Sequence, residues 1–145
     1  MPVICDFTSI GDRDDNLDRI LHIDCGFFSI SFIMDGFCIK RDSYHYVDYF
    51  VGEVSKGVKE ISDLDSACDF ILGLINSNGG VDGKSTLSVV IYNKDKIKYL
   101  SIGDSRIYFL NSKVRTKDDS IAQKLIDSGV SPESSLRTHP YRNRL

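Results

Sequence analysis

The spacing of apolar residues changes twice along this chain, and this change limits the folds that the chain can adopt. From residue 27 to residue 34, apolar side chains alternate with serines, which is typical of a strand with one buried face. From residue 42 to residue 77, apolar residues recur every three or four positions, as on helices packed against a core. Alternation returns between residues 86 and 110. This order predicts an α+β fold in which helices pack on an antiparallel sheet.

The expected elements have boundaries that can be read from the same pattern. Strands are expected at residues 3–10, 20–23, 27–34, 86–92, 97–102 and 106–110. Helices are expected at residues 42–59, from Ser62 to about residue 77, and from residue 119 or 120 to residue 128. Ser62, with Asp65 three positions later, resembles a helix N-cap. Residues 93–96 predict a turn, and Gly103 with Asp104 predicts a tight corner.

Composition excludes several classes of protein. The net charge is −3 over 145 residues, without the basic face that nucleic-acid binding requires. No apolar run approaches the roughly 18 residues of a membrane-spanning helix, and the N-terminus has no signal-peptide pattern. The four cysteines form no metal-binding pattern, which favours reduced thiols; they are Cys5, Cys25, Cys38 and Cys68. We therefore expect one cytoplasmic domain over residues 1–145, with no nucleic-acid or membrane partner.

The densest group of charges lies at residues 12–18, where four of seven residues are aspartates. Such a group requires a compensating cation, and hard oxygen ligands suit Mg²⁺, Mn²⁺ or Ca²⁺. A solvated acidic loop is the alternative. An EF-hand loop is disfavoured, because Leu17 and Ile23 occupy the positions where that loop needs glycine and glutamate.

Two further aspartates are expected at the ends of strands. Asp35 with Gly36 follows an apolar strand, and Asp104 follows the strand at residues 97–102. A carboxylate at a strand end is held rigidly at the rim of the sheet, although an ordinary turn explains an Asp-Gly pair equally well. Arg106 is expected to form an ion pair with Asp104.

Residues 82–86, Asp-Gly-Lys-Ser-Thr, invite comparison with a phosphate-binding loop. That loop needs glycine at position 78, where this chain has Asn78, and a helix must follow it. A strand is expected to follow here instead. Nucleotide binding is therefore disfavoured.

Taken in order, these motifs resemble the type 2C (PPM-type, metal-dependent) serine/threonine protein phosphatases. The segment from Gly103 to Arg106 is similar to the Gly-Asp-Ser-Arg hallmark of that family, and Met34-Asp35-Gly36 resembles its Asp-Gly motif. Residues 13–19 resemble Arg-x-x-Asn-Glu-Asp-Arg, and residues 84–87 resemble the family's Gly-Thr-Thr element. Residues 116–120 resemble Leu-Thr-x-Asp-His-Ser with Asp119 in place of histidine, and residues 139–145 resemble a bacterial His-Pro-x-Arg-Asn-x-Leu stretch.

The resemblance implies a fold, a cofactor and a reaction. The fold is a β-sandwich of two antiparallel sheets between helix pairs, here incomplete. Two Mg²⁺ or Mn²⁺ ions would hold a hydroxide that attacks the phosphorus of phosphoserine or phosphothreonine in a protein. Arg13 would bind the substrate phosphate, Asp35 and the Gly36 carbonyl would bind metal, Asp18 would support the site, and Asp104 would lie near an accessory metal.

Three departures from the family pattern leave three hypotheses open. Leu17 stands where the family has a metal-facing glutamate, residues 37–39 replace small residues, and the remaining metal aspartates of the family are expected beyond Leu145. The first hypothesis is a phosphatase with weak or no activity of its own, and the second is a non-catalytic relative, a pseudophosphatase, that binds a phosphoprotein or partner protein. The third is a small α+β interaction domain that shares only the fold. An open sheet edge would also favour a homo-oligomer or a completing chain.

Overall fold

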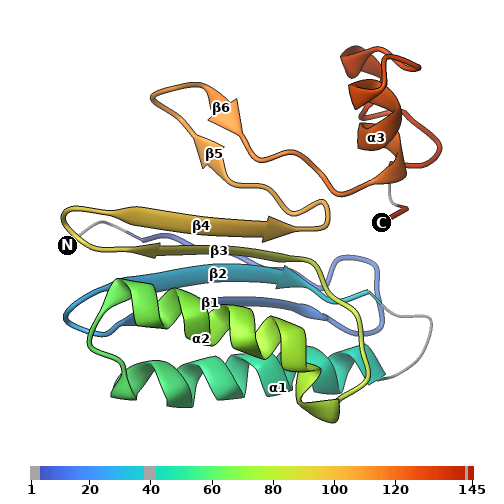
Figure 1. The fold of residues 1–145 in the computed structure, drawn as a ribbon. Helices are drawn as coiled ribbons and strands as arrows, with labels where there is room; N and C mark the ends of the chain where they lie inside the picture. Colours follow the sequence, from blue (N-terminus) through green and yellow to red (C-terminus); the bar gives the residue numbers. More distant parts are fainter. Residues whose placement is uncertain (1–3, 38–41, 143) are drawn as a thin grey trace.

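A four-stranded antiparallel sheet and two helices form the larger part of the computed structural model, which describes residues 4–37, 42–142 and 144–145 (Figure 1). The strands are β1 (Asp18–Asp24), β2 (Ser29–Asp35), β3 (Leu87–Tyr92) and β4 (Ile97–Ile102), hydrogen-bonded in that order. Helices α1 (Asp42–Gly57) and α2 (Leu64–Ser77) cover one face of this sheet. The α+β class expected from the sequence is therefore confirmed.

The core lies between the sheet and the two helices. Because side chains alternate along a strand, β2 directs Ile30, Phe32 and Met34 to the helix side, where each is at most 2% exposed. From α1, Phe50 meets Phe32 edge to face, with ring centroids 5.9 Å apart. Burying a side chain of this size contributes about 1.5–3 kcal/mol, so these contacts anchor α1 to the sheet.

The start of α2 differs from the expectation by one residue. The Asp63 carboxylate accepts hydrogen bonds from the Ser66 N–H at 2.8 Å and from the Ser66 hydroxyl at 2.6 Å. Asp63 is therefore the N-cap, and the prediction of Ser62 is wrong. The expected end is confirmed, since Gly79 and Gly80 leave the helical path with φ of 56° and 72°.

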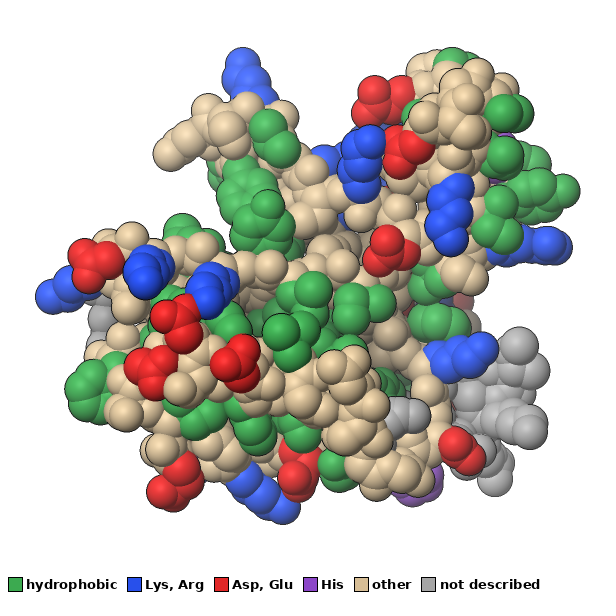
Figure 2. Space-filling view, viewed as in Figure 1, with side chains coloured by type: hydrophobic (Ala, Val, Ile, Leu, Met, Phe, Trp, Pro, Cys, Tyr) green, Lys and Arg blue, Asp and Glu red, His purple; other side chains and the backbone are tan. Residues whose placement is uncertain are grey.

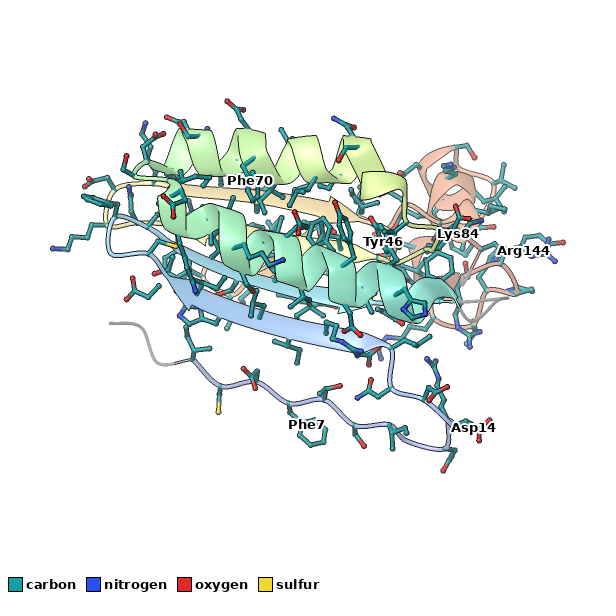
Figure 3. The ribbon with its side chains drawn as sticks, turned by 90° about the horizontal axis from the view of Figure 1, so that it is seen from below. Phe7, Asp14, Tyr46, Phe70, Lys84 and Arg144 are labelled. Atoms are coloured by element: carbon teal, nitrogen blue, oxygen red, sulfur yellow. The ribbon has the colours of Figure 1, made fainter. Side chains whose placement is uncertain are left out.

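The strand expected at residues 3–10 is absent from residues 4–10, the part of it that the structure describes, so this prediction is wrong. Residues 4–10 have no strand partner, and Phe7 is 84% exposed. Figure 3 shows Phe7 on a segment that runs along the helix-free side of the sheet, apart from β1. Alternating apolar residues favour a strand only where another strand supplies the backbone hydrogen bonds, and none lies beside this segment among the described residues.

Beyond β4 the chain forms a short hairpin and a third helix (Figure 1). The hairpin pairs β5 (Tyr108–Phe109) with β6 (Val114–Arg115), so the expected strand at residues 106–110 is shorter than predicted. Helix α3 (Ile121–Asp127) begins after Ser120, whose hydroxyl accepts the Gln123 N–H. Single 3₁₀ turns are present at Val58–Glu60, Asn78–Gly80 and Glu133–Ser135. In the space-filling view a notch separates the hairpin from the α3 region (Figure 2).

Two expectations from composition concern thiols and membrane spans. Cys5, Cys25 and Cys68 are free thiols, and Cys38 lies outside the described residues. Burial, followed by the charge of Asp24, raises the pKa of the Cys25 thiol, which keeps it protonated at neutral pH. No helix in the described part of the chain combines the length and hydropathy that a bilayer crossing requires.

Candidate metal and phosphate site

Four strand ends meet at one rim of the sheet. In the antiparallel register, Asp18 at the start of β1 lies opposite Asp35 at the end of β2. Leu87 at the start of β3 lies opposite Ile102 at the end of β4, directly before the Gly103–Asp104 corner. Pairing therefore gathers residues from four segments at this rim, where the strand-end pattern predicted Asp35 and Asp104.

Asp35 is the electrostatic centre of the rim. Burial raises the pKa of the Asp35 carboxyl, and the charge of Asp18 raises it further. A hydrogen bond with the Asp18 side chain and the charge of Asp104 act in the same direction, while the Arg13 charge lowers this pKa. All three aspartates are half-buried. The Asp18 and Asp104 carboxylates thus both disfavour a charge on Asp35, and such a group favours a cation among them.

Arg13 belongs to a loop that closes this rim from the helix-free side. Asp18 and Asp35 point to that side, because the residues that alternate with them along β1 and β2 face the helices. The loop at residues 9–17 and the two aspartates line a pocket of about 400 Å³. Figure 3 shows Asp14, in the same loop, at the end of the sheet where Lys84 lies. An exposed guanidinium on such a pocket has the chemistry to bind a phosphate.

Gly36 brings the Leu17 backbone into close contact with the end of β2. Its N–H donates to the Leu17 carbonyl at 3.3 Å. A Cβ at Gly36 would lie 3.0 Å from both the Leu17 Cβ and the Leu17 carbonyl oxygen, so a larger residue would push this loop away. Leu17 therefore lies beside Asp35 and lines the same pocket, as an apolar side chain among acidic ones.

Arg106 does not pair with Asp104, so that expectation is wrong. Its Nε and Nη2 donate to the two oxygens of Asp118, each at 2.6 Å, and the Asp118 side chain is 3% exposed. Arg115 adds a second contact to Asp118 at 3.5 Å. These hydrogen bonds raise the pKa of Arg106. The arginine of the Gly-Asp-Ser-Arg segment thus fixes the hairpin to the segment before α3, and Asp104 stays at the rim.

Two residues for which the sequence predicts no role hold the Gly103–Asp104 corner. Thr86, 1% exposed, donates its N–H to the Asp35 carbonyl at 2.9 Å and places its hydroxyl 2.5 Å from that of Ser105. The Asp119 carboxylate accepts the Gly103 N–H at 3.1 Å. Neither periodicity nor spacing indicates these contacts, because each joins segments that are distant in sequence.

The rim matches part of a divalent-cation site. Asp18 and Asp35 offer hard oxygen donors of the kind that Mg²⁺ and Mn²⁺ use, and Mg²⁺ commonly binds one or two carboxylates while it keeps several waters. Among the described residues, however, no three His, Cys, Asp or Glu side chains are grouped so as to hold a metal. The residues present thus fit one hydrated cation and do not by themselves make a two-metal centre.

The two disfavoured sequence alternatives also find no support at this rim. Residues 83–86 lead into β3, so no helix N-terminus follows the Gly-Lys-Ser-Thr segment as a phosphate loop requires. The EF-hand reading requires a ring of oxygen ligands around the loop at residues 12–23. In the structure, residues 18–23 of that span belong to β1.

Comparison with solved structures places this geometry in a known fold. The serine/threonine phosphatase Stp1 from Staphylococcus aureus matches with a TM-score of 0.81 and 19% identity, over 96% of this chain and 62% of that one. The S. agalactiae serine/threonine phosphatase matches at 0.76 and 22%, over 92% and 62%. The catalytic domain of the phosphatase PstP, in complex with two manganese ions, matches at 0.62 and 19%, over 86% and 59%.

The chain therefore has the fold of the PPM-type serine/threonine phosphatases, and it spans about three fifths of the length of the structures that it matches. The fold recognition made from the sequence motifs is confirmed. No protein-family model and no curated protein sequence matches the chain.

Proposed function

We propose that this chain contributes the phosphate-binding rim of a PPM-type phosphatase, which hydrolyses phosphoserine or phosphothreonine in proteins with Mg²⁺ or Mn²⁺. The observation that carries this proposal is the pairing of Asp18 with Asp35 at the sheet rim, within the electrostatic reach of Arg13 and Asp104. A fold alone does not define a function, but a group of mutually repelling carboxylates beside an arginine is typical of a metal-assisted phosphate site.

Each rim residue has a distinct role in this proposal. Asp35, Asp18 and the Gly36 carbonyl would hold the cation, and Asp104 would lie near an accessory one. A bound Mg²⁺ or Mn²⁺ acidifies water and neutralises phosphate charge. Arg13 binds the phosphate oxygens and orients the phosphorus toward the carboxylates. Because the described donors fit one hydrated cation, we expect weak activity from this chain alone.

A second function, favoured by one specific observation, is a non-catalytic domain that binds a phosphoprotein. Leu17 lines the pocket at the place where an additional carboxylate would increase cation affinity. An apolar residue there leaves Arg13 as a phosphate contact while it weakens the metal centre. In this case the domain would recognise phosphorylated protein without releasing phosphate.

One set of assays separates the two functions. The purified chain is incubated with Mn²⁺ or Mg²⁺ and an aryl phosphate or a phosphothreonine peptide, with a chelator as control. Metal-dependent turnover that Asp35→Asn abolishes supports the enzyme. Peptide binding without turnover, lost in Arg13→Ala and kept in the exposed control Lys113→Ala, supports the binding domain. The absence of both would contradict each proposal.

We also propose that β4 pairs with another polypeptide, either a second copy or a completing chain. β4 is an edge strand of the four-stranded sheet, and its Ile97 and Tyr99 are 63% and 55% exposed. Figure 2 shows hydrophobic side chains exposed beside α2 and β4, where an apolar pocket includes Leu72 and Leu100. In the part of the chain that the structure describes, β4 is paired on one side only, and such an edge offers its backbone groups to another chain. A chain that remains monomeric at high concentration in size-exclusion chromatography would exclude the second copy.

A further inference from the structure

We propose that Asp119 is a positioning residue that holds the Gly103–Asp104 corner from the α3 side, while Thr86 holds it from the sheet side, so that Asp104 keeps a fixed place at the rim that carries Asp35. The inference concerns the metal-free geometry of the corner. Its consequence for cation binding rests on the proposed function.

The contact on the α3 side consists of two hydrogen bonds between the same two residues. The Asp119 carboxylate accepts the Gly103 N–H at 3.1 Å, and the Asp119 N–H donates to the Gly103 carbonyl at 2.8 Å. Asp119 directly precedes Ser120, the N-cap of α3. The start of α3 is therefore tied to the backbone of the residue that precedes Asp104. Asp119 itself is exposed, so the two hydrogen bonds to Gly103 lie at the surface of the domain.

The contact on the sheet side is close and buried. Gly103 has φ of 90°, and a Cβ added there would lie 2.7 Å from the Thr86 Cγ2. The Thr86 hydroxyl also accepts the Asp35 N–H at 3.2 Å. On the far side of the corner, the Ser101 hydroxyl donates to the Ser105 carbonyl at 2.8 Å. The corner is thus joined through Thr86 to the backbone that carries Asp35.

The position of the corner matters because the corner and Asp35 share one buried support. Thr86 bonds both to the backbone of Asp35 and to the hydroxyl of Ser105, the residue that follows Asp104. Thr86 fixes the corner relative to β2, and Asp119 prevents it from swinging toward solvent. Loss of a residue that orients a metal ligand typically reduces metal affinity 10–100-fold. We expect the same scale here for the Asp104 side of the rim.

The test compares variants by amide NMR in metal-free protein and then during Mn²⁺ titration. Asp119→Ala should shift or broaden the Asp104 amide signal, and Asp119→Asn, which keeps the oxygen acceptor, should restore it. In Asp119→Ala, the Mn²⁺ concentration that halves the Asp104 signal should rise at least about tenfold, with less change at Asp35. The control is Asp127→Ala, which removes an equal charge from α3 and leaves the corner untouched. Thr86→Val and Thr86→Ser form a second pair, in which only the serine keeps the hydroxyl.

Two results would overturn the inference. One is an unchanged Asp104 signal in Asp119→Ala. The other is an equal shift in Asp119→Ala and Asp119→Asn, which would show that charge rather than the hydrogen bond acts on the corner. If Mn²⁺ does not broaden the Asp35 signal of the unmodified chain, the metal-binding part of the proposed function is wrong. The metal-free spectra then decide the role of Asp119 alone.

Discussion

Asp18 and Asp35 occupy opposite positions on neighbouring antiparallel strands, so that their carboxyl groups share one end of the sheet. Like charges directly opposite each other destabilise a sheet. The structure keeps this pair at the rim, where the Arg13 charge offsets part of the repulsion. The remaining repulsion should lower the stability of the metal-free chain, and a bound cation would relieve it.

Asp35→Asn should stabilise the metal-free chain at neutral pH. The folded-state pKa of Asp35 is raised, mainly by burial, above its value of roughly 4 in the unfolded chain. Between those two pKa values the folded state binds more protons, so stability falls as pH rises through this window. The asparagine variant has no carboxyl to titrate at this position, so its free energy of unfolding should not fall in this way. Urea denaturation with chelator at a series of pH values from 4 to 7 measures the free energy of unfolding, with the exposed Asp14→Asn as control. Lower stability of Asp35→Asn at pH 7 would contradict the prediction.

Leu17→Glu should increase the affinity of the rim for Mn²⁺. Leu17 lines the pocket beside Asp35, and a third carboxylate there would complete a set of hard oxygen donors. We expect at least about a tenfold decrease in the dissociation constant for Mn²⁺, measured by calorimetry. Leu110→Glu, on an 83% exposed side chain of the hairpin, adds the same charge away from the pocket. Equal effects of the two variants would show that only net charge matters.

Gly103→Ala should destabilise the chain more than Gly129→Ala. Both glycines have positive φ, 90° and 77°, and a side chain in this region costs about 1–3 kcal/mol. A Cβ at Gly129 meets no atom within 4 Å, whereas one at Gly103 meets Thr86. The contact should add roughly 1–3 kcal/mol, as overpacking does elsewhere. Urea denaturation of the two variants gives the difference, and equal losses would argue against the close contact with Thr86.

Asp118→Ala should lower the free energy of unfolding by about 2–4 kcal/mol. Asp118 is buried and accepts two short hydrogen bonds from Arg106, and removing one partner of such a pair leaves the other charge unsatisfied. Asp127→Ala breaks the exposed ion pair with Lys117 and should have a much smaller effect, because solvent screens that pair. Thermal unfolding distinguishes the two. If Asp118→Ala is as mild as Asp127→Ala, Arg106 does not depend on Asp118.

Local patterns in the sequence were sufficient to predict most of the four-stranded sheet and its two helices. Alternation located β2, β3 and β4, and the spacing of three and four residues located α1 and α2. Strand ends predicted the rim positions of Asp35 and Asp104, because antiparallel pairing brings alternate ends together. The place of Asp18 followed only from the family resemblance, since the first strand was expected to begin at residue 20 and begins at Asp18. These predictions rest on periodicity, which the backbone geometry enforces wherever one face is buried.

Contacts between distant segments could not be predicted in the same way. The segment at residues 4–10 has a strand pattern, but a pattern carries no information on whether a partner strand is present. Sequence proximity predicts Asp104 as the partner of Arg106, whereas the partner in the structure is Asp118, twelve positions away. Thr86 and Asp119 act through backbone groups of other segments, and amino-acid type alone does not indicate such contacts.

The hairpin between β1 and β2 has a consequence for how this site tolerates insertions and deletions. Asp18 and Asp35 lie opposite each other only because the other six residue pairs of β1 and β2 hold the two strands in this register. Lengthening the turn around Gly26 leaves that register intact, so the connection is free to vary in length. A single residue gained or lost within either strand would instead turn one carboxylate toward the helices and separate the pair. Insertions and deletions in the turn therefore preserve the site, whereas those within β1 or β2 disrupt it.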